Sequence, residues 1–491
     1  MQRFAWLLLL LLAGCGKMED LRKNPNKATI AQPGVIFSGI AQSMFVQPWG
    51  DAQRSSQYHC ITYSYYGNQS YSFGAASFYY NVLRNVDQLV KEARRNGTDA
   101  MRPYYALADF MRAWFYINMT VQTGDIPMSE AMKAEQGIDR PVYDAQRDVY
   151  LQCLQLLQQS QDTLAKLNSS GNYRIEGDFF FKGNLKQWQK IVNAFRLRVL
   201  ISLSNKASDA ELKVKENFNA ILQLPLPESN ADNLEIVYST AELSNYYPAY
   251  SLTPEASAKR NPLGATYVDL LKTFRDPRLL VVGMPAAING NDSMAVHNFD
   301  AYRGASTGTL QGALNDSASK GYFSLPDYRY WFSSPVGHPT VLLGFPEVNF
   351  TIAEAINRGW VNGKDAAAYY RAGITANMQY YEIPAVSIEQ YLAQPLLQYA
   401  GNNAAGFTQI LQQKYLAFFQ QSGWEAFYNQ RRTGIPAFAI GPANQNHGLI
   451  PRRWIYPASE TIDNLDHLTA ALQRQYNGAD NINGVMWLLQ Q

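Results

Sequence analysis

Cys15 is the residue whose chemistry the sequence specifies most directly. It follows Arg3 and an apolar run over 6–12, and the segment Leu12-Ala13-Gly14-Cys15 fits a bacterial lipobox. In such a segment small residues admit the chain to the signal peptidase, and the cysteine sulfur accepts a diacylglycerol before cleavage. The apolar run is about half of the roughly 20 residues that a membrane-spanning helix needs. We therefore predict a signal peptide over 1–14 and a palmitate-bearing anchor on Cys15; the alternative is an ordinary cleaved signal with a chance cysteine.

Two other patterns could support hydrolysis. Gly304-Ala305-Ser306-Thr307-Gly308 matches G-x-S-x-G, but a nucleophile elbow needs an apolar strand before the serine and a helix after it, and neither is predicted here. Glu347 and Glu354 could form a glycosidase pair, which needs its carboxyl groups about 5 to 9.5 Å apart. On one helix they would lie roughly 10 Å apart along the axis. We expect a chance match for the first and a polar contact between helices for the second, while a carboxyl pair elsewhere stays open.

Metal, phosphate and nucleic-acid sites find little support in the sequence. The histidines show no H-x-x-x-H or H-E-x-x-H spacing, and no P-loop or G-x-G-x-x-G segment occurs. The 42 Lys and Arg residues nearly balance the 40 Asp and Glu residues, and no long basic block appears. We therefore expect no metal site, no cofactor and no nucleic-acid partner.

Aromatic residues are the strongest candidates for ligand contact. The chain has 32 Tyr and 9 Trp, and a Tyr combines a flat apolar face with a hydroxyl at little entropic cost. Such faces suit sugar rings, although any one Tyr could equally fill a seam between helices. Two irregular stretches are favoured because loops present side chains to solvent. The predicted ligand-binding residues are Trp49, Tyr65, Tyr66, Tyr71 and Phe73 in the first stretch and Tyr302, Tyr322, Tyr328, Tyr330 and Trp331 in the second.

Helices must position these loops, and apolar residues three and four positions apart indicate where they lie. The pattern predicts helices over 36–47, 78–93, 104–121, 143–167, 184–203, 348–358, 364–381, 388–399 and 407–432. The segment 104–121 is apolar on nearly all sides, so other helices should cover it. Prolines break 207–346 into loops and short helices, and the C-terminal tail should be mostly loops. Helix pairs of this length suggest a tetratricopeptide-like stack, although no sustained repeat of about 34 residues is found.

The predicted fold is therefore mainly α, with a tetratricopeptide-like scaffold of helical hairpins and a large irregular, loop-rich part. By length the chain could hold about two to four domains or one large helical domain. We predict the signal peptide, a lipidated tether over 15–30 and one α-helical domain over 31–491. The scaffold should occupy about 78–205 and 347–436, and the irregular ligand-bearing part about 48–74 and 207–346. A disulfide between Cys60 and Cys153 stays open, but Cys153 lies in the apolar stripe of a predicted helix, so we favour two free thiols.

Six segments, in order along the chain, resemble one known family. They are Asn24-Pro25-Asn26; 113–131 with Gly124-Asp125-Ile126-Pro127; 188–198; 347–359 with Ala353-Glu354-Ala355; Trp424-Glu425-Ala426 leading into 431–436; and Pro451-Arg452-Arg453 with Tyr456-Pro457. Together they resemble the SusD/RagB family of nutrient-binding outer-membrane lipoproteins of Bacteroidetes, in its SusD-like subgroup. The segment 16–20 also resembles the tether signal that sends such lipoproteins to the outer face.

The resemblance implies a tetratricopeptide-like helical scaffold, an irregular ligand-bearing half and no catalysis. It also implies a partner, a SusC-like TonB-dependent outer-membrane barrel that this chain would cover as a lid. Within the shared segments, Gly124 and Gly434 would stop helices and Pro127 and Pro436 would break them. Four arginines, Arg196, Arg198, Arg431 and Arg432, would serve as buried partners of carboxylates or carbonyl groups. The family's ligand residues lie in variable loops, so none carries over by position.

The sequence leaves the ligand class open. The first hypothesis is a surface lipoprotein that binds an oligosaccharide on aromatic loops and passes it to a transporter. Its closest alternative is a peptide-binding member of the same family. A surface glycoside hydrolase and a scaffold that binds only a protein partner are two further alternatives.

Overall fold

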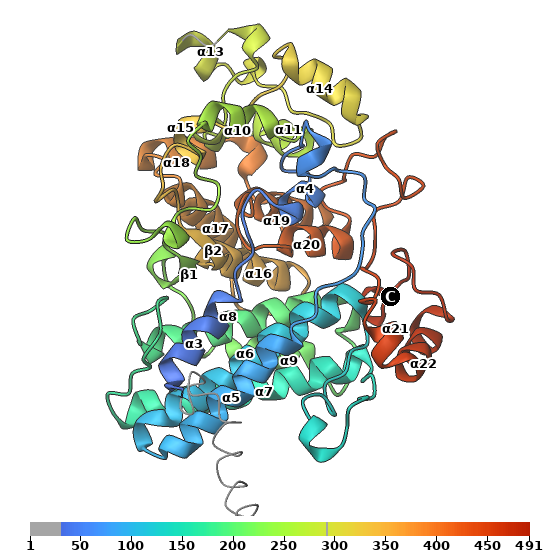
Figure 1. Cartoon of the computed structure of the whole chain (residues 1–491). Helices are drawn as coiled ribbons and strands as arrows, with labels where there is room; N and C mark the ends of the chain where they lie inside the picture. Colours follow the sequence, from blue (N-terminus) through green and yellow to red (C-terminus); the bar gives the residue numbers. More distant parts are fainter. Residues whose placement is uncertain (1–30, 291–292) are drawn as a thin grey trace, which may run out of the picture.

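Long helices form where the sequence places apolar residues at helical spacing. The computed structural model describes residues 31–290 and 293–491, so the predicted signal peptide, Cys15 and the tether lie outside the described residues. The N-terminal helices confirm the predicted positions to within a few residues and form the lower half of the molecule in Figure 1. They are α3 (Pro33–Gln42), α5 (Tyr80–Asn96), α6 (Arg102–Thr123), α7 (Gln146–Ser170) and α8 (Leu185–Ser202). The short helix α9 (Val214–Ile221) lies with them, whereas α4 (Asp51–Ser55), where no helix was predicted, lies in the upper half of Figure 1.

The α6 helix is covered on nearly all sides, as its apolar sequence predicts. It packs between α5 and α7, and α7 packs in turn against α8. Trp188 of α8 fills the centre of this half, with ring centroids 5.9 Å from Phe37 and 5.7 Å from Phe110. Its indole nitrogen donates to Asp178 Oδ2 at 2.9 Å, so the buried polar atom is satisfied. Successive antiparallel helices thus bury one continuous apolar interior, as in a stack of helical hairpins.

A second group of helices lies above the first in Figure 1. It contains α16 (Phe345–Asn357), α17 (Ala366–Tyr380), α18 (Ala385–Leu392), α19 (Ala404–Ala417) and α20 (Glu425–Thr433). The prediction of one helix over 407–432 was wrong, because the chain bends between α19 and α20. Gln420, Ser422 and Gly423 there have φ angles of 60°, 54° and 56°, in the left-handed region that ends a right-handed helix. The bend over 418–424 ends at Trp424, directly before α20.

The proline-rich part is irregular, as predicted, and its short helices reach the top of Figure 1. They are α10 (Pro254–Arg260), α11 (Ala265–Thr273), α12 (Arg278–Val282), α13 (Ser293–His297), α14 (Gln311–Ser319) and α15 (Tyr328–Trp331). Two short antiparallel strands that the sequence did not predict, β1 (Leu234–Ile236) and β2 (Thr340–Leu343), pair with Leu234 opposite Leu343. Ser306 lies in a loop before α14, so the strand, turn and helix of a nucleophile elbow do not form around it.

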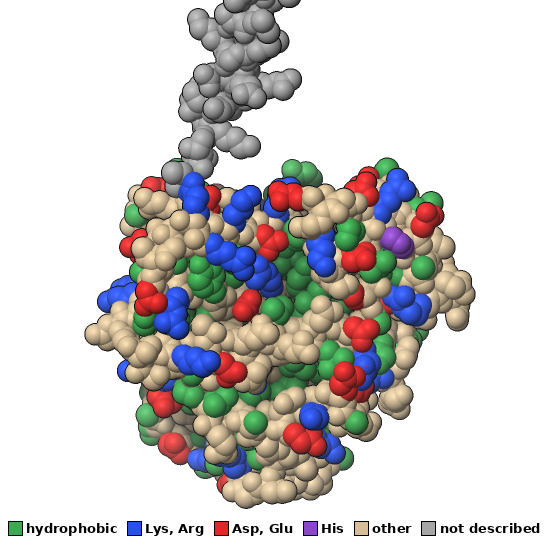
Figure 2. Space-filling view, turned by 90° about the horizontal axis from the view of Figure 1, so that it is seen from below, with side chains coloured by type: hydrophobic (Ala, Val, Ile, Leu, Met, Phe, Trp, Pro, Cys, Tyr) green, Lys and Arg blue, Asp and Glu red, His purple; other side chains and the backbone are tan. Residues whose placement is uncertain are grey.

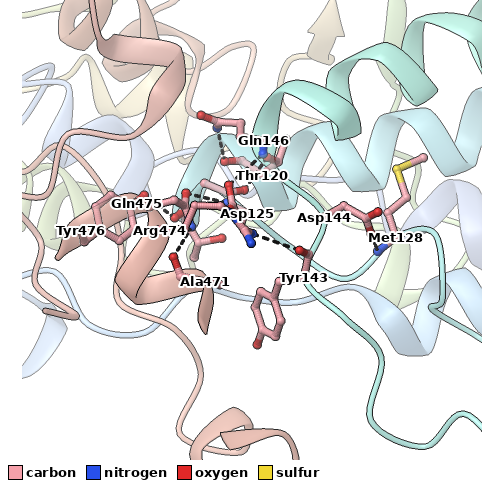
Figure 3. A network of polar contacts seen from close by, with 12 residues as sticks. Thr120, Asp125, Met128, Tyr143, Asp144, Gln146, Ala471, Arg474, Gln475 and Tyr476 are labelled. Atoms are coloured by element: carbon pink, nitrogen blue, oxygen red, sulfur yellow. Dashed lines mark hydrogen bonds and ion pairs between the residues drawn. The ribbon is translucent and has the colours of Figure 1, made fainter. Parts of the chain in front are cut away.

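The C-terminal tail was predicted to be mostly loops, but it contains α21 (Glu460–Asp463) and α22 (Leu465–Tyr476). Figure 3 shows how α22 holds the turn after α6. The Arg474 guanidinium pairs with the Asp125 carboxylate, which also accepts the Gln146 backbone N–H at 2.8 Å. The preceding residue is Gly124, with φ 96°; a Cβ there would lie 2.0 Å from Gln475 Oε1. Only glycine suits this close approach, which explains the helix stop at 124.

One buried ion pair joins the two groups of helices, and a second joins two helices of the upper group. Arg198 of α8 donates through Nε and Nη2 to the two carboxylate oxygens of Glu347 in α16, both at 2.6 Å. Arg432 of α20 donates to Glu354 at 2.5 and 2.9 Å. Both glutamates therefore make contacts between helices, as expected, rather than forming a catalytic pair. Bidentate geometry and nearly complete burial make these pairs strict constraints on how α8, α16 and α20 fit together.

The remaining structural expectations concern arginines, cysteines and surface charge. Arg431 donates to the Val121 carbonyl at 2.8 Å, as expected, whereas Arg196 donates to the side-chain amides of Asn193 and Gln158 instead of a carboxylate or carbonyl. Cys60 and Cys153 are buried free thiols, which confirms the preferred interpretation. On the face shown in Figure 2, Lys and Arg side chains are interspersed with Asp and Glu, with apolar side chains in the hollows. Within the described residues, no helix is both long and apolar enough to cross a membrane.

Glu354 provides a test of the buried ion pairs. Burial opposes its ionisation, but Arg432 and neighbouring cations outweigh that effect and lower its pKa from 4.5 to about 2. A lowered pKa adds stability above pH 4.5 that is lost as pH falls toward 2. We expect Glu354→Gln to lower the free energy of unfolding at neutral pH by about 3 kcal/mol, since one pKa unit corresponds to about 1.4 kcal/mol. Chemical denaturation as a function of pH measures both this loss and the flatter acid profile.

The matched control is Glu389→Gln. Glu389 pairs with Arg371 at 3.6 Å on the surface, where its side chain is 71% exposed. Exposed pairs contribute little, so this variant should unfold like the parent. A Glu354→Gln variant that also matched the parent at neutral pH would contradict the role given to the buried pair.

Candidate functional site

A groove of about 870 Å³ lies between the first loop, α4, α10 and two tryptophan-bearing segments. A hollow of about 360 Å³ adjoins it and shares Asp51, Ala75, Trp424 and Trp454 with its lining. We call the two together the aromatic groove. Besides those four, its main lining side chains are Trp49, Arg54, Tyr66, Tyr71, Phe73, Tyr79, Gln122, Tyr250, Ser257, Arg260, Asn261 and Phe332. Asp51, Tyr66 and Ser72 are exposed, so the groove opens to solvent.

Aromatic rings form both the floor and the rim of the groove. On the floor, Trp49 packs against Phe332 with ring centroids 5.0 Å apart. Trp454 stacks on Phe73 at 4.5 Å, and Trp424 meets Trp454 edge-on at 4.9 Å. Toward the rim, Tyr66 is 48% exposed. The floor rings are held by other rings, while the rim ring keeps a face available for a ligand.

Glutamine side chains fix Trp49 and the bend over 418–424 to each other. Trp49 has a φ angle of 62°, which is unusual for a bulky residue, and its backbone N–H donates to Gln420 Oε1 at 2.6 Å. Gln420 in turn donates its backbone N–H to Gln53 Oε1 at 2.7 Å. Because the surrounding hydrogen bonds over-determine these conformations, the groove wall is preformed rather than assembled around a ligand.

Gln57 holds the other end of the first loop. Its side-chain nitrogen donates to the Tyr71 hydroxyl and to the Ala439 carbonyl, each at 2.8 Å. Its side-chain oxygen accepts from the Thr266 hydroxyl at 2.6 Å, and the Tyr71 hydroxyl donates to the Ser55 carbonyl at 3.0 Å. One buried amide thus ties the loop to α11 and to the C-terminal segment, which limits how far the loop can move.

The C-terminal segment places Trp454 in the groove. The Trp454 backbone N–H donates to the Gln122 carbonyl near the end of α6 at 2.9 Å. The Ile455 backbone N–H donates to the Gly74 carbonyl at 3.2 Å, and the Ala76 backbone N–H donates to the Ile455 carbonyl at 2.8 Å. The segment is therefore inserted between α6 and the first loop. The Tyr456 hydroxyl donates to the Asp125 carbonyl at 2.7 Å, which connects this segment to the network of Figure 3.

Three charged side chains line the groove: Asp51, Arg54 and Arg260. Arg54 pairs with Asp51, and burial lowers the pKa of the Arg54 guanidinium although Asp51 opposes that shift. The Arg260 guanidinium lies over the Tyr66 ring, 4.9 Å from its centroid. His59 lies beneath Trp49 with centroids 5.2 Å apart, and burial lowers its pKa to about 3, so it is neutral at physiological pH. The groove can thus offer ring faces, amide and hydroxyl groups, and guanidinium donors.

The first predicted loop does line the groove, with one exception. Trp49 and Tyr66 line the main cavity, and Tyr71 and Phe73 line the adjoining hollow. Tyr65 is 90% exposed and meets Tyr66 edge-on, with centroids 5.1 Å apart, but it does not line the groove. Trp49 and Tyr71 are largely buried, so only part of each ring is available.

The second predicted set lies elsewhere. Tyr302 and Trp331 were expected to present open ring faces, but both side chains are buried in the core. The Trp331 indole N–H donates to the Val282 carbonyl at 3.0 Å. Tyr330 stacks on His338 with centroids 3.7 Å apart. Tyr322 and Tyr328 lie outside the groove lining. The Arg303 guanidinium lies 5.8 Å from the Tyr322 ring centroid, and the Arg329 guanidinium lies 5.6 Å from that of Tyr328. This stretch contributes Phe332 to the groove instead.

Sequence reasoning missed Tyr250, Phe332, Trp424, Trp454 and Arg260. Trp424 and Trp454 lie in or beside two segments that carry the family resemblance, and the sequence analysis assigned neither of them a role in ligand binding. A ring can pack against the scaffold with one face and line a cavity with the other. Apolar periodicity in the sequence indicates the packing but not the contact with the cavity. Within residues 31–290 and 293–491, no group of three His, Cys, Asp or Glu side chains is placed to hold a metal ion.

Comparisons with known proteins identify the family to which the chain belongs. Residues 25–457 match the family described as starch-binding and associating with the outer membrane. A SusD homologue from Bacteroides fragilis is similar in structure, with 31% sequence identity, 94% of this chain and 100% of that chain covered, and a TM-score of 0.85. A Bacteroides vulgatus outer-membrane protein linked to nutrient binding has 32% identity, the same coverage and a TM-score of 0.82.

More distant structures share the fold alone. A chitin-binding SusD homologue from Flavobacterium johnsoniae has 21% identity, covers 94% of this chain and 99% of that chain, and gives a TM-score of 0.74. A search of curated proteins gave no match. Because the family match spans most of the chain and the homologue from Bacteroides fragilis is covered in full, the chain belongs to the SusD-like family.

Proposed function

We propose that this protein is a non-catalytic, cell-surface nutrient-binding lipoprotein that captures an oligosaccharide in the aromatic groove. The observation that carries the proposal is a preformed, solvent-open cavity lined by aromatic rings from several distant segments. Sugar rings have apolar faces that stack on aromatic side chains, and their hydroxyl groups bond to polar groups at the rim. The family's description as starch-binding and the chitin-binding homologue support a glycan over a peptide.

The groove lining also supports binding without catalysis. Glycoside hydrolysis uses two carboxyl groups on either side of the scissile bond. Asp51 is the one carboxylate among the groove-lining residues of the described chain, and it is paired with Arg54. A bound oligosaccharide would therefore be released intact.

The bound oligosaccharide would be passed to a partner protein in the outer membrane. We assign the lipid on Cys15 the role of holding the protein at the outer membrane, beside a SusC-like TonB-dependent barrel that takes up the ligand. Tethering raises the effective concentration of the two partners, so that a modest interface suffices for repeated capture and transfer.

Replacing Tyr66 tests the groove. We expect Tyr66→Ala to weaken binding of the best ligand in a panel of soluble glycans by about tenfold, because a stacked aromatic ring contributes roughly 0.5 to 1.5 kcal/mol beyond its buried area. Isothermal titration calorimetry measures the change. Tyr322→Ala is the control, since that ring also has an arginine beside it but lies outside the groove. Loss of binding in Tyr322→Ala with none in Tyr66→Ala would assign the ligand to the second predicted loop.

Glycans should remain uncleaved when they are incubated with the purified protein. We expect no new reducing ends after prolonged incubation of the protein with each glycan that it binds, because the groove lacks a second carboxyl group. A reducing-sugar assay measures this directly, with a known glycosidase as the positive control. Steady product release that Asp51→Asn abolishes would identify a hydrolase instead.

Blocking lipidation separates anchoring from binding. Cys15→Ser removes the sulfur that accepts the lipid, so we expect the protein to fold and bind glycan normally while losing surface retention and uptake. Fractionation, surface labelling and growth on the glycan measure the three effects. Normal uptake by the Cys15→Ser strain would contradict both the lipobox interpretation and the role given to the anchor.

A further inference from the structure

The charge inside the aromatic groove differs from the near balance of the whole chain. Two guanidinium groups, Arg54 and Arg260, line it against one carboxylate, Asp51. Asp51 is paired with Arg54, and the described structure shows no carboxylate in an ion pair with Arg260. With His59 neutral, one positive charge remains uncompensated beside the aromatic rings. A ligand with a negative group would supply the missing charge.

The backbone holds Arg260 in place at the rim. It is the last residue of α10, and its carbonyl accepts the Thr62 backbone N–H at 3.0 Å. Its guanidinium donates to the Ser257 hydroxyl at 2.9 Å while lying over the Tyr66 ring. The remaining donors of this planar group are free to form the two parallel hydrogen bonds that guanidinium makes with a carboxylate.

The second guanidinium, that of Arg54, lies close to the residue that follows Tyr66. Gly67 follows Tyr66 with φ 126°, and a Cβ at this position would lie 2.6 Å from Arg54 Nη2. The Arg54 side chain is only 9% exposed, and its Nε has no hydrogen-bond partner. Glycine at 67 thus leaves room for the Arg54 guanidinium beside the turn. Arg54 already has a carboxylate partner in Asp51, so the charge that is left for a ligand is that of Arg260.

We propose that the groove selects oligosaccharides that carry carboxylate groups, such as uronic acids, with Arg260 as the residue that recognises the charge. This inference rests on the proposed function, since it names the class of glycan for the same site. A sugar ring would stack on Tyr66 and its neighbours while its carboxylate accepts hydrogen bonds from the Arg260 fork. Neutral oligosaccharides would make the stacking contacts alone.

Paired ligands test the proposal. Oligogalacturonate, oligomannuronate and a hyaluronan oligosaccharide are each titrated into the full chain beside their carboxyl-reduced, neutral forms. We expect at least one acidic form to bind about tenfold or more tightly than its neutral form, because charge-assisted hydrogen bonds are roughly twice as strong as neutral ones. The preference should shrink as the salt concentration rises, since salt screens an exposed charge.

Variants then assign the preference to one residue. Arg260→Gln should bind acidic and neutral forms equally, and Arg260→Lys should keep part of the preference through its charge. Arg329→Gln is the control, because Arg329 also lies over a tyrosine ring, 5.6 Å from the Tyr328 centroid, but lies outside the groove. Circular dichroism and thermal unfolding establish that each variant is folded, and the wild-type ratio of acidic to neutral binding tests the proposal without any variant.

The outcomes separate this inference from the proposed function. A clear acidic preference that disappears in Arg260→Gln and persists in Arg329→Gln supports it. Equal or tighter binding of neutral glycans, or a preference that Arg260→Gln leaves intact, overturns the charge assignment while leaving glycan binding in place. Binding of an acidic peptide with no binding of any oligosaccharide overturns both, as does a protein that binds none of the probes or a wider glycan panel.

Discussion

The burial of Glu347 in α16 is the constraint on which the rest of the structure depends. Its carboxylate pairs with Arg198 of α8 and also accepts a hydrogen bond from the Ser422 hydroxyl at 3.2 Å. Ser422 lies in the bend that carries Trp424, and its backbone N–H donates to Val341 of β2 at 2.8 Å. One buried charge therefore connects the N-terminal hairpins, the small sheet and the groove wall. An uncompensated charge at this depth would be strongly unfavourable, so these elements have little freedom to shift apart.

Buried ion pairs of this kind stabilise a fold less than an equally packed apolar core would, because both charges lose their hydration. Their advantage here is geometric. A bidentate pair fixes direction as well as distance, and the bend over 418–424 contains left-handed residues that local preference alone would not hold. We infer that the ion pairs, together with the Gln53 and Gln420 hydrogen bonds, keep the groove open in the absence of ligand.

Local patterns predicted the fold far better than the site. Apolar spacing located α5 to α8 because each of these helices buries one face or more. The helical spacing of Glu347 and Glu354 also led to the correct prediction that both carboxylates make contacts between helices. The break after α19 carries a turn signal in Ser422-Gly423 that the helical spacing over 407–432 outweighed. Gln420 gave no such signal, because its left-handed angle is held by a tertiary hydrogen bond. Trp331 and Tyr302 were misplaced because a proline-broken stretch can be buried as well as exposed. Trp424 and Trp454 reach Phe73 only through folding, across most of the chain length.

The groove is thus built from two kinds of parts with different constraints. The tryptophans on its floor are packed against other rings and lie in or beside segments that hold helices together, so changing them would disturb the scaffold. The Tyr66 ring and the Arg260 guanidinium lie on a loop and on the end of a short helix, and each touches few other side chains. Under the proposed function, substitutions at these rim positions would change which ligand is bound while leaving the scaffold in place. Under the same proposal, the floor would supply stacking and the rim would supply selectivity, so that one helical scaffold could present different binding surfaces.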